Sequence, residues 1–332
     1  SISLSPNPVS AARWLFNIPT PISSFHKRIL LVDEPVLSPL LTHRQGNWSN
    51  LPVQVHKVGN AIETPRISVI VPLYGRTDFV EHQMIEFYSD AWFKDHAQLI
   101  YVIDDPRIVD SFKADAHALY SLYGVPFTWV WGSVNRGFAG ANNLGVQAAK
   151  ANKLLFLNSD VFPNTVDWLR QLCHTLDENR DFGVIGPQLV FADGSIQHAG
   201  MEFTRHEELG IWVNHHPNKG LDPILDDRSG LIEVPAVTGA CLAIRRKDFD
   251  RVGGWDTGCL IGDFEDSDLC LKIRKEGMKV GYLPDIQLTH LERQSFKELG
   301  NDDFRTRVVI FNAVRNQERW DSFFVGPEEQ PS

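Results

Sequence analysis

Short apolar runs that alternate with helical patterns constrain the fold of this chain more than any other feature. The runs are rich in β-branched and aromatic residues and lie at residues 67–73, 98–103, 127–130 and 154–157. Helical patterns separate them, around residues 79–88, 114–123 and 141–149. Strands that alternate with helices predict right-handed βαβ units, and therefore an α/β, Rossmann-like fold with a mostly parallel central sheet flanked by helices.

The rest of the chain divides into further elements and two flanking segments. We expect helices at 166–176, 264–276 and 302–320, strands at 182–186, 234–244 and 278–283, and a long polar loop at 205–230. A loop of that length is usually functional or mobile. Residues 1–64 are rich in Pro, Ser and Asn and are typical of a small appended β-rich or irregular segment. This gives an N-terminal appendage (1–64), a main domain (65–296) and a C-terminal helical extension (297–332).

The composition argues against a nucleic-acid-binding protein and favours a cytoplasmic one. The net charge of −10 and the pI near 5.6 argue against a nucleic-acid-binding surface, which needs clustered Lys and Arg. Four cysteines without a C-x-x-C pair indicate reduced thiols in a cytoplasmic protein, with peripheral contact at the inner face of a membrane left open. The chain begins with Ser1, which is typical of a processed protein or of one piece of a longer one.

The acidic doublet Glu265-Asp266 opens the helix predicted at residues 264–276, and Asp263 and Asp268 flank it. Helix capping explains Asp263, but four carboxylates exceed what capping needs, because like charges one turn apart repel. The helix dipole should help to keep Asp266 ionised. A carboxylate in that position can accept a proton from an attacking hydroxyl.

Asp160 follows the buried run 154–157, directly after Asn158 and Ser159. This places it at the carboxyl edge of the sheet, where open α/β sheets bind ligands. There it can hold Mg²⁺ or Mn²⁺, which neutralises the charge of a departing diphosphate. A buried turn aspartate is the commoner meaning of such a triplet.

Asp104 and Asp105 end the second run, and Pro106 stops that strand. Carboxylates at such an edge can accept hydrogen bonds from a nucleobase or a ribose. A turn or a helix cap is the alternative.

Residues 135–143 (NRGFAGANN) follow the third run and combine glycines with side-chain amides. The glycines let the backbone approach a ligand that the amides can orient. The residues of this segment that are predicted to contact a ligand are Asn135, Arg136, Gly137 and Asn142. A tight turn between strand and helix is the alternative.

His290 follows the last predicted strand, where its imidazole can complete a metal shell or contact a diphosphate, with Arg293 near the same charge. A lone histidine is more often structural. Further candidates are His198, His215 and His216.

The order of these motifs resembles that of the family 2 glycosyltransferases of the GT-A fold, particularly bacterial members that build O-antigen, capsule and other surface polysaccharides. The resemblance covers about residues 66–296. It is carried by VIVPLY (69–74), VIDD (102–105), NRGFAGANN (135–143), LFLNSD (155–160), VTGAC (237–241), GGWD (253–256), Glu265-Asp266 and His290.

The resemblance implies a role for each matching residue. Asp104 or Asp105 would bind the nucleobase of a nucleotide sugar, in a pocket lined by Pro72 and Tyr74. Asp160 matches the metal-binding end of the family's D-x-D motif, and His290 the late histidine near the metal and the diphosphate. Asp266 matches the catalytic base and Glu265 its neighbour at the acceptor site. Asn158, Ser159 and Gly239 complete the expected donor contacts.

Two departures from the family pattern bear on these roles. Asn158 stands where the motif begins with aspartate, which leaves fewer charged metal ligands. The sequence Asp104-Asp105-Pro106-Arg107 replaces the usual acidic-Gly-Ser turn and so bears on donor recognition.

Together these assignments predict an inverting glycosyltransferase that uses Mn²⁺ or Mg²⁺. It would move a sugar from a nucleotide-diphosphate sugar to a hydroxyl of a saccharide or lipid-linked saccharide, in bacterial surface polysaccharide synthesis. A sugar-nucleotide nucleotidyltransferase is one alternative, disfavoured because no Gly-rich basic phosphate loop follows the first strand. A non-catalytic carbohydrate-binding or assembly module with the same fold is the other.

Overall fold

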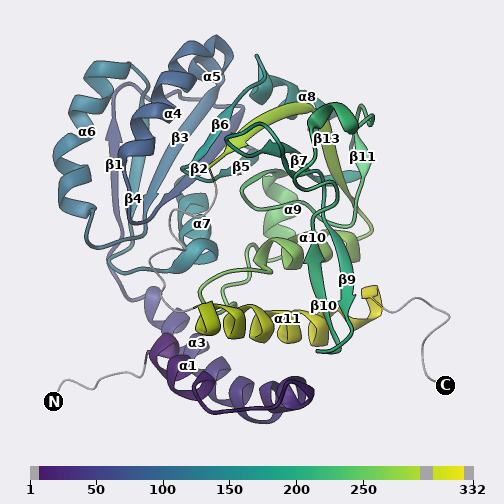
Figure 1. Ribbon diagram of the computed structural model, residues 1–332. Coiled ribbons are helices and arrows are strands. Elements are labelled where there is room, and N and C mark those ends of the chain that lie inside the picture. The colour runs from purple at the N-terminus through teal and green to yellow at the C-terminus, as the bar shows by residue number, and fades with distance from the viewer. Residues whose placement is uncertain (1–6, 292–301, 325–332) are drawn as a thin grey trace, which may run out of the picture.

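A large mixed β-sheet with helices on both faces forms the body of the protein in this computed structural model, which describes residues 7–291 and 302–324 (Figure 1). In the described residues, its strands follow the order β1-β4-β3-β2-β5-β12-β7-β13-β11, with β6 beside β13 and β8 beside β7. The bounds are β1 Gln54–Val58, β2 Ile67–Leu73, β3 Ala97–Ile103, β4 Phe127–Trp131, β5 Lys153–Leu157, β6 Val161–Pro163, β7 Phe182–Val190, β8 Ile196–His198, β11 Ile232–Glu233, β12 Cys241–Arg245 and β13 Lys279–His290.

The first half of the sheet is a parallel block. β2 pairs in parallel with both β3 and β5, and β3 pairs in parallel with β4. β2 is buried along almost its whole length, because helices cover both faces, and this explains why its sequence is a continuous apolar run. The predicted α/β class is confirmed. The second half of the sheet is mixed, since β12 runs antiparallel to β5 and β7.

Helices cover the two faces of the sheet in separate groups. One group consists of α4 Asp78–Ser89, α5 Ala91–His96, α6 Val109–Tyr123 and α8 Trp168–Glu178, and the other of α7 Gly137–Ala148, α9 Arg246–Arg251 and α10 Glu265–Lys275. α7 lies very close to the sheet at Gly145, where an added Cβ would meet Ile70 at 2.5 Å and Val102 at 2.8 Å. Glycine is therefore required there for the helix to pack.

The N-terminal segment is helical, which corrects the expectation of a β-rich or irregular appendage. Its elements are α1 Pro8–Phe16, η1 Ile22–Ser24, α2 Phe25–Arg28, η2 Ile29–Asp33 and α3 Glu34–Trp48. Asn7 caps α1 by accepting a hydrogen bond from the Val9 backbone, and Pro8 stands in the first turn. β1 then pairs antiparallel with β4, so the central sheet begins before residue 65.

These N-terminal helices pack on α11 Asp302–Phe324, and together they form what we call the lower layer (Figure 1). Leu37 and Leu41 of α3 share a buried cluster with Phe311 of α11. The rings of Phe16 and Phe311 lie 6.1 Å apart. The predicted boundary at residues 296 and 297 lies outside the described residues. Within the described part of the chain, no helix is both long and apolar enough to cross a membrane.

Two other expectations need correction. The predicted loop 205–230 contains a hairpin, β9 Glu202–His206 with β10 Ile211–His215, and a short helix, η3 Pro223–Leu225. The predicted strand 234–244 is formed only at β12: β11 precedes it at residues 232–233, and residues 234–240 connect the two strands, with an isolated bridge between Ala236 and Met201. Pro235 has no N–H to donate to a ladder, which explains the interruption. All four cysteines are free, and three are buried.

The buried contacts of the lower layer predict that it unfolds together with the body. Leu37→Ala should lower the free energy of unfolding by about 2–5 kcal/mol, because it opens a cavity at a fully buried site. Val36→Ala on the same helix should cost less than about 0.5 kcal/mol, since Val36 is 45% exposed. Urea unfolding followed by tryptophan fluorescence measures both. A main transition that Leu37→Ala leaves unchanged would contradict joint unfolding.

Candidate active site

The predicted site residues gather beyond the carboxyl ends of β2 and β5. The chain proceeds from β2 to β3 and β4 on one side, whereas β5 returns to the other side of β2. Such a reversal of strand order opens a crevice that binds ligands in α/β sheets. Cys241, the first residue of β12, lies opposite Leu157, the last residue of β5. The residues before β12, Gly239 among them, therefore reach the same edge.

Asp160 and His290 come together although 130 positions separate them. β6 pairs antiparallel with β13, opposing His290 to Val161, and the Leu291 backbone donates to the Asp160 carbonyl at 3.0 Å. The Nε2 atom of His290 lies 3.3 Å from Oδ1 of Asp160. Both side chains are largely but not fully buried. The two residues that the family resemblance assigns to the metal thus form a pair.

Gln197 in β8, which the sequence analysis did not single out, orients the His290 ring. Its Nε2 donates to the His290 backbone carbonyl at 3.3 Å, so its Oε1 faces Nδ1 of the ring at 2.6 Å. Because an amide oxygen only accepts hydrogen bonds, Nδ1 carries a proton. In the neutral ring, Nε2 then presents a lone pair on the side of Asp160. Orientation of a histidine by a second residue is typical of metal ligands.

The Asp160–His290 pair fits a divalent cation that is also held by substrate. Among residues 7–291 and 302–324, no group of three or more His, Cys, Asp or Glu side chains could hold a metal ion. Mg²⁺ is commonly bound by one or two protein ligands together with phosphate oxygens and water, and the pair suits that mode. Asn158 in place of an aspartate agrees with a small protein contribution.

Asp266 faces the segment that precedes β12. Its Oδ2 accepts a hydrogen bond from the Gly239 backbone at 3.1 Å, and its Oδ1 accepts one from the Ser267 backbone at 2.8 Å. The Ala240 carbonyl accepts from the Asn158 backbone at 2.9 Å, so the acidic helix and the Asp160 loop meet on adjacent residues. The sequence pattern alone does not reveal this meeting, because the partners are backbone groups.

Burial raises the pKa of Asp266, although hydrogen bonds from Gly239 and Ser267 act in the opposite direction. This shift is opposite to the effect expected from the helix dipole, which favours the ionised form of Asp266. The pKa of Glu265 is raised well above its usual value, first by burial and then by the charge of Asp266. Its Oε2 is buried without a hydrogen-bond partner. The two adjacent buried carboxyls therefore disfavour the ionisation of both at once.

The other two acidic residues have different surroundings. Asp268 is 2% exposed and pairs with Lys272 at 2.8 Å and Arg319 at 3.0 Å, on the side of α11. Asp263 lies in the loop before the helix with a positive φ of 74°. The acidic cluster therefore divides into the doublet Glu265-Asp266 and a structural anchor, Asp268.

Asp104 interacts with the start of α7. Its Oδ1 accepts from the Arg136 backbone at 2.6 Å, and its Oδ2 accepts from Asn135 Nδ2 at 2.9 Å. Burial raises its pKa to about 8, against the hydrogen bonds from Arg136 and Gly137. Protein groups thus bind this carboxyl, which joins the end of β3 to the start of α7.

Asp105 contacts the end of β2. Its Oδ2 accepts from the Gly75 backbone at 3.1 Å and from Arg107 Nη2 at 2.7 Å. Burial alone would raise its pKa, but these hydrogen bonds and the charge of Arg107 hold it below the usual value. The Arg107 guanidinium also lies 5.6 Å from the centre of the Tyr74 ring. Asp105 and Tyr74 therefore lie together just beyond β2, next to the last residues of that strand, Pro72 among them.

The remaining candidates lie in three places. Asn142 is fully buried and donates to the Phe138 carbonyl of its own helix, so it does not face the crevice. Asn143 instead holds the turn before Trp255, donating to its carbonyl and accepting from its N–H. Ser159 is half-buried in the loop that leads to Asp160, and His215 is exposed at the end of β10.

His198 links the hairpin region to the segment before β12. The Thr238 backbone donates to its Nε2 at 3.4 Å, and burial lowers its pKa well below the usual value. The ring is therefore neutral, and its Nδ1–H donates to Nδ1 of His216 at 3.2 Å. Thr238 directly precedes Gly239, so this contact supports the residue that binds Asp266.

Comparisons with known proteins place this geometry in a family. The model of the family described as glycosyl transferase family 2 matches residues 68–253, more than half of the chain. The chain belongs to this family. Within it, the chain is 33% identical over 200 residues to the uncharacterized protein y4gI of Sinorhizobium fredii, covering 59% of this chain and 21% of that protein. It is 24% identical over 237 residues to the O-antigen biosynthesis protein RfbC of Myxococcus xanthus, covering 70% of this chain and 18% of that protein.

A solved structure supports the fold of this family 2 member. The crystal structure of GalNAc-T7 with UDP, GalNAc and Mn²⁺ superposes with a TM-score of 0.60 at 18% identity, over 79% of this chain and 49% of that one. The predicted GT-A fold is confirmed. The chain spans about a fifth of the length of y4gI and RfbC.

The buried doublet predicts a pH-dependent effect of Glu265→Gln on stability. A carboxyl whose pKa is raised in the folded state binds its proton more tightly there, so folding becomes less favourable as pH rises above the ordinary value of 4.5. Glutamine cannot ionise, so the stability of the variant relative to the wild type should increase with pH. Thermal unfolding between pH 5 and 8 measures the difference, with the exposed Glu276→Gln as control. A difference that does not change with pH would contradict the raised pKa.

Proposed function

We propose that this chain is the catalytic domain of an inverting glycosyltransferase. It moves a sugar from a nucleotide-diphosphate sugar to a hydroxyl of a saccharide acceptor. The proposal is carried by one observation: the backbone from Thr238 to Ala240 contacts the acidic doublet on one side and the loop of Asp160 on the other. Membership of glycosyl transferase family 2 supports transfer over the formation of sugar nucleotides.

In the proposed reaction, Asp266 takes the proton from the acceptor hydroxyl. The hydroxyl oxygen forms a bond to the anomeric carbon as the bond from that carbon to the diphosphate oxygen breaks, and the electron pair leaves with the diphosphate. A single displacement inverts the configuration at the anomeric carbon. The raised pKa of Asp266 makes it a stronger base once it is deprotonated, which suits this task.

Asp160 and His290 are the residues that would hold a divalent cation, Mn²⁺ or Mg²⁺. When bound, such an ion supplies neutralisation of the negative charge that develops on the leaving diphosphate. Gln197 keeps the His290 ring in the tautomer that leaves Nε2 available. Asn158, Ser159 and Gly239 border the same edge of the sheet.

On the donor side, we assign the nucleobase to the cluster of Pro72, Tyr74 and Asp105 at the end of β2. Asp104 serves this site indirectly, because it fixes Asn135 and Arg136 at the start of α7. The similarity to the O-antigen biosynthesis protein RfbC favours an acceptor among bacterial surface polysaccharides, free or linked to lipid. The four free cysteines favour a site of action in the cytoplasm or at the inner face of the membrane.

Asp266→Asn should slow transfer strongly while donor binding persists. Asparagine has nearly the same shape but cannot accept the proton, so we expect kcat to fall by about 10²–10⁴-fold with a donor Kd within about twofold of wild type. Asp263→Asn is the matched control, because it removes a neighbouring charge and asparagine tolerates a positive φ. Release of nucleoside diphosphate from a panel of nucleotide sugars measures the rate, and NMR of the product measures its anomeric configuration.

Two results would overturn the proposal. Near-normal turnover by Asp266→Asn in a folded protein would remove the base assignment. A product that keeps the anomeric configuration of the donor would exclude the single displacement.

A further inference from the structure

The loop before the acidic doublet has a backbone conformation that needs external support. Ile261, Asp263 and Phe264 all have positive φ angles, at 66°, 74° and 73°. Non-glycine residues rarely adopt this region, and for a β-branched residue such as isoleucine it is an outlier. Such a strained conformation persists only where surrounding contacts enforce it. Glu265 follows Phe264 directly, so the conformation of this loop determines the direction in which the side chains of Glu265 and Asp266 point.

The side-chain amide of Asn312 on α11 supplies that support. Its Oδ1 accepts from the Leu260 backbone at 2.9 Å, and its Nδ2 donates to the carbonyls of Leu260 at 3.0 Å and Gly262 at 2.6 Å. Asn312 is 1% exposed. All three contacts go to the strained loop, and they use both ends of the amide. Among side chains, only the amides of asparagine and glutamine offer these donors and the acceptor together.

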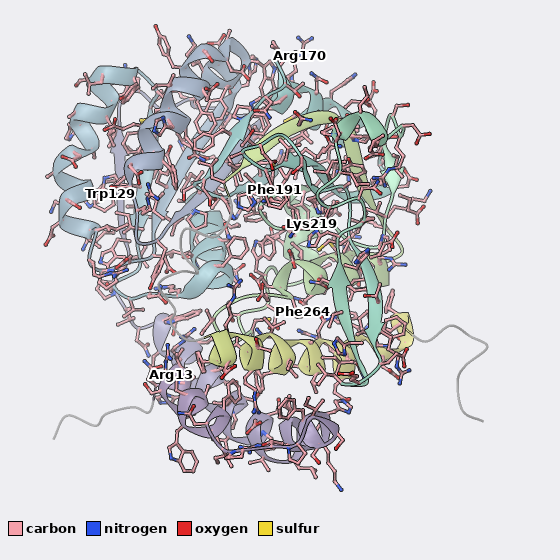
Figure 2. The ribbon with its side chains drawn as sticks, in the orientation of Figure 1. Arg13, Trp129, Arg170, Phe191, Lys219 and Phe264 are labelled. Carbon is pink, nitrogen blue, oxygen red and sulfur yellow. The ribbon has the colours of Figure 1, made fainter. Side chains whose placement is uncertain are left out.

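Two apolar side chains hold the loop against the same helix. Leu260 and Phe264 are buried in the cluster of the lower layer together with Phe311 and Val308 of α11. Figure 2 shows Phe264 beside α11, in the middle of the molecule. The loop is thus fixed by packing on either side of the amide contacts.

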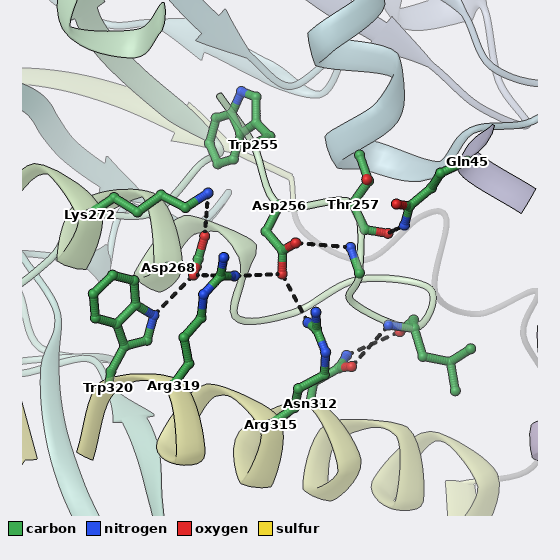
Figure 3. A network of polar contacts seen from close by, with 12 residues as sticks. Gln45, Trp255, Asp256, Thr257, Asp268, Lys272, Asn312, Arg315, Arg319 and Trp320 are labelled. Atoms are coloured by element: carbon green, nitrogen blue, oxygen red, sulfur yellow. Dashed lines mark hydrogen bonds and ion pairs between the residues drawn. The ribbon is translucent and has the colours of Figure 1, made fainter. Parts of the chain in front are cut away.

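Ion pairs fix α11 to the chain on both sides of the loop (Figure 3). Arg315 and Arg319 pair with Asp256, before the loop, at 2.9 and 3.2 Å. Arg319 also reaches Asp268 of α10 at 3.0 Å, and the indole N–H of Trp320 donates to Asp268 at 3.0 Å. Burial alone would raise the pKa of Asp256, but the two arginines hold it below its usual value. α11 is therefore bound to the chain both before the doublet, at Asp256, and after it, at Asp268.

We infer that Asn312 is a positioning residue, which holds the loop 260–264 in its strained conformation and thereby sets the orientation of Glu265 and Asp266. The inference rests on the proposed function for the meaning of that orientation. It gives the C-terminal helix a role in the reaction although no residue of α11 is expected to touch substrate.

Asn312→Ala in the full chain tests this role, with Val314→Ala as the matched control. Val314 is equally buried on α11 and packs in the same cluster, but makes no hydrogen bond to the loop. Hydrogen exchange of the backbone of residues 258–266, without substrate, should speed up by tenfold or more in Asn312→Ala alone. In turnover assays, kcat should fall by about 10–100-fold, with the donor KM within about twofold of wild type.

A second variant keeps the test decisive if Asn312→Ala lowers overall stability. Ile261→Gly relieves the strain, because glycine adopts a positive φ without steric cost. Added to Asn312→Ala, it should restore at least part of kcat. The inference is overturned if loop exchange in Asn312→Ala equals that in Val314→Ala, or if both variants lose kcat equally. The exchange result does not depend on activity. A wild-type chain without transferase activity would therefore refute the proposed function, and the exchange result would still decide whether Asn312 holds the loop 260–264.

Discussion

The hydrogen bond from the Gly239 backbone to the Asp266 carboxylate is the contact on which the architecture of the candidate site depends. Gly239 reaches it because β12 runs antiparallel to β5, which brings the start of one strand to the end of the other. The neighbouring Ala240 carbonyl binds the backbone of Asn158. One short segment thus joins the acidic helix directly to the loop of Asp160, and so links the proposed base to the proposed metal ligands.

Backbone strain and buried carboxyl groups lie together on the other side of this contact, at the start of the acidic helix. Three residues with positive φ precede the doublet, and Glu265 has a buried carboxyl oxygen without a partner. Such features cost stability and are tolerated where function requires them. The lower layer provides the compensating contacts, because α11 packs on the N-terminal helices and binds the loop through Asn312. The segment that looked like an appendage therefore supports the site.

The sequence was sufficient for the parallel block of the sheet, because strands buried on both faces, such as β2 and β3, are continuous apolar runs. It failed for residues 1–64, which were expected to be β-rich or irregular. The apolar run at residues 29–32 lies in a helix, and a short apolar run does not distinguish a strand from a buried helix. Motifs located Asp160, Asp266 and His290. The roles of Gln197 and Asn312 could not be predicted, because polar residues gain such roles only from partners that are distant in the sequence.

Calorimetric titration of nucleoside diphosphates into the wild-type chain and into Asp160→Ala, with and without Mn²⁺, tests the central claim that Asp160 and His290 form a metal-dependent donor site. The account predicts that one nucleoside diphosphate binds at least tenfold more tightly with Mn²⁺ and that Asp160→Ala abolishes this gain. The claim would be contradicted if Mn²⁺ strengthened binding equally in both proteins, or if no nucleoside diphosphate bound the folded wild-type chain.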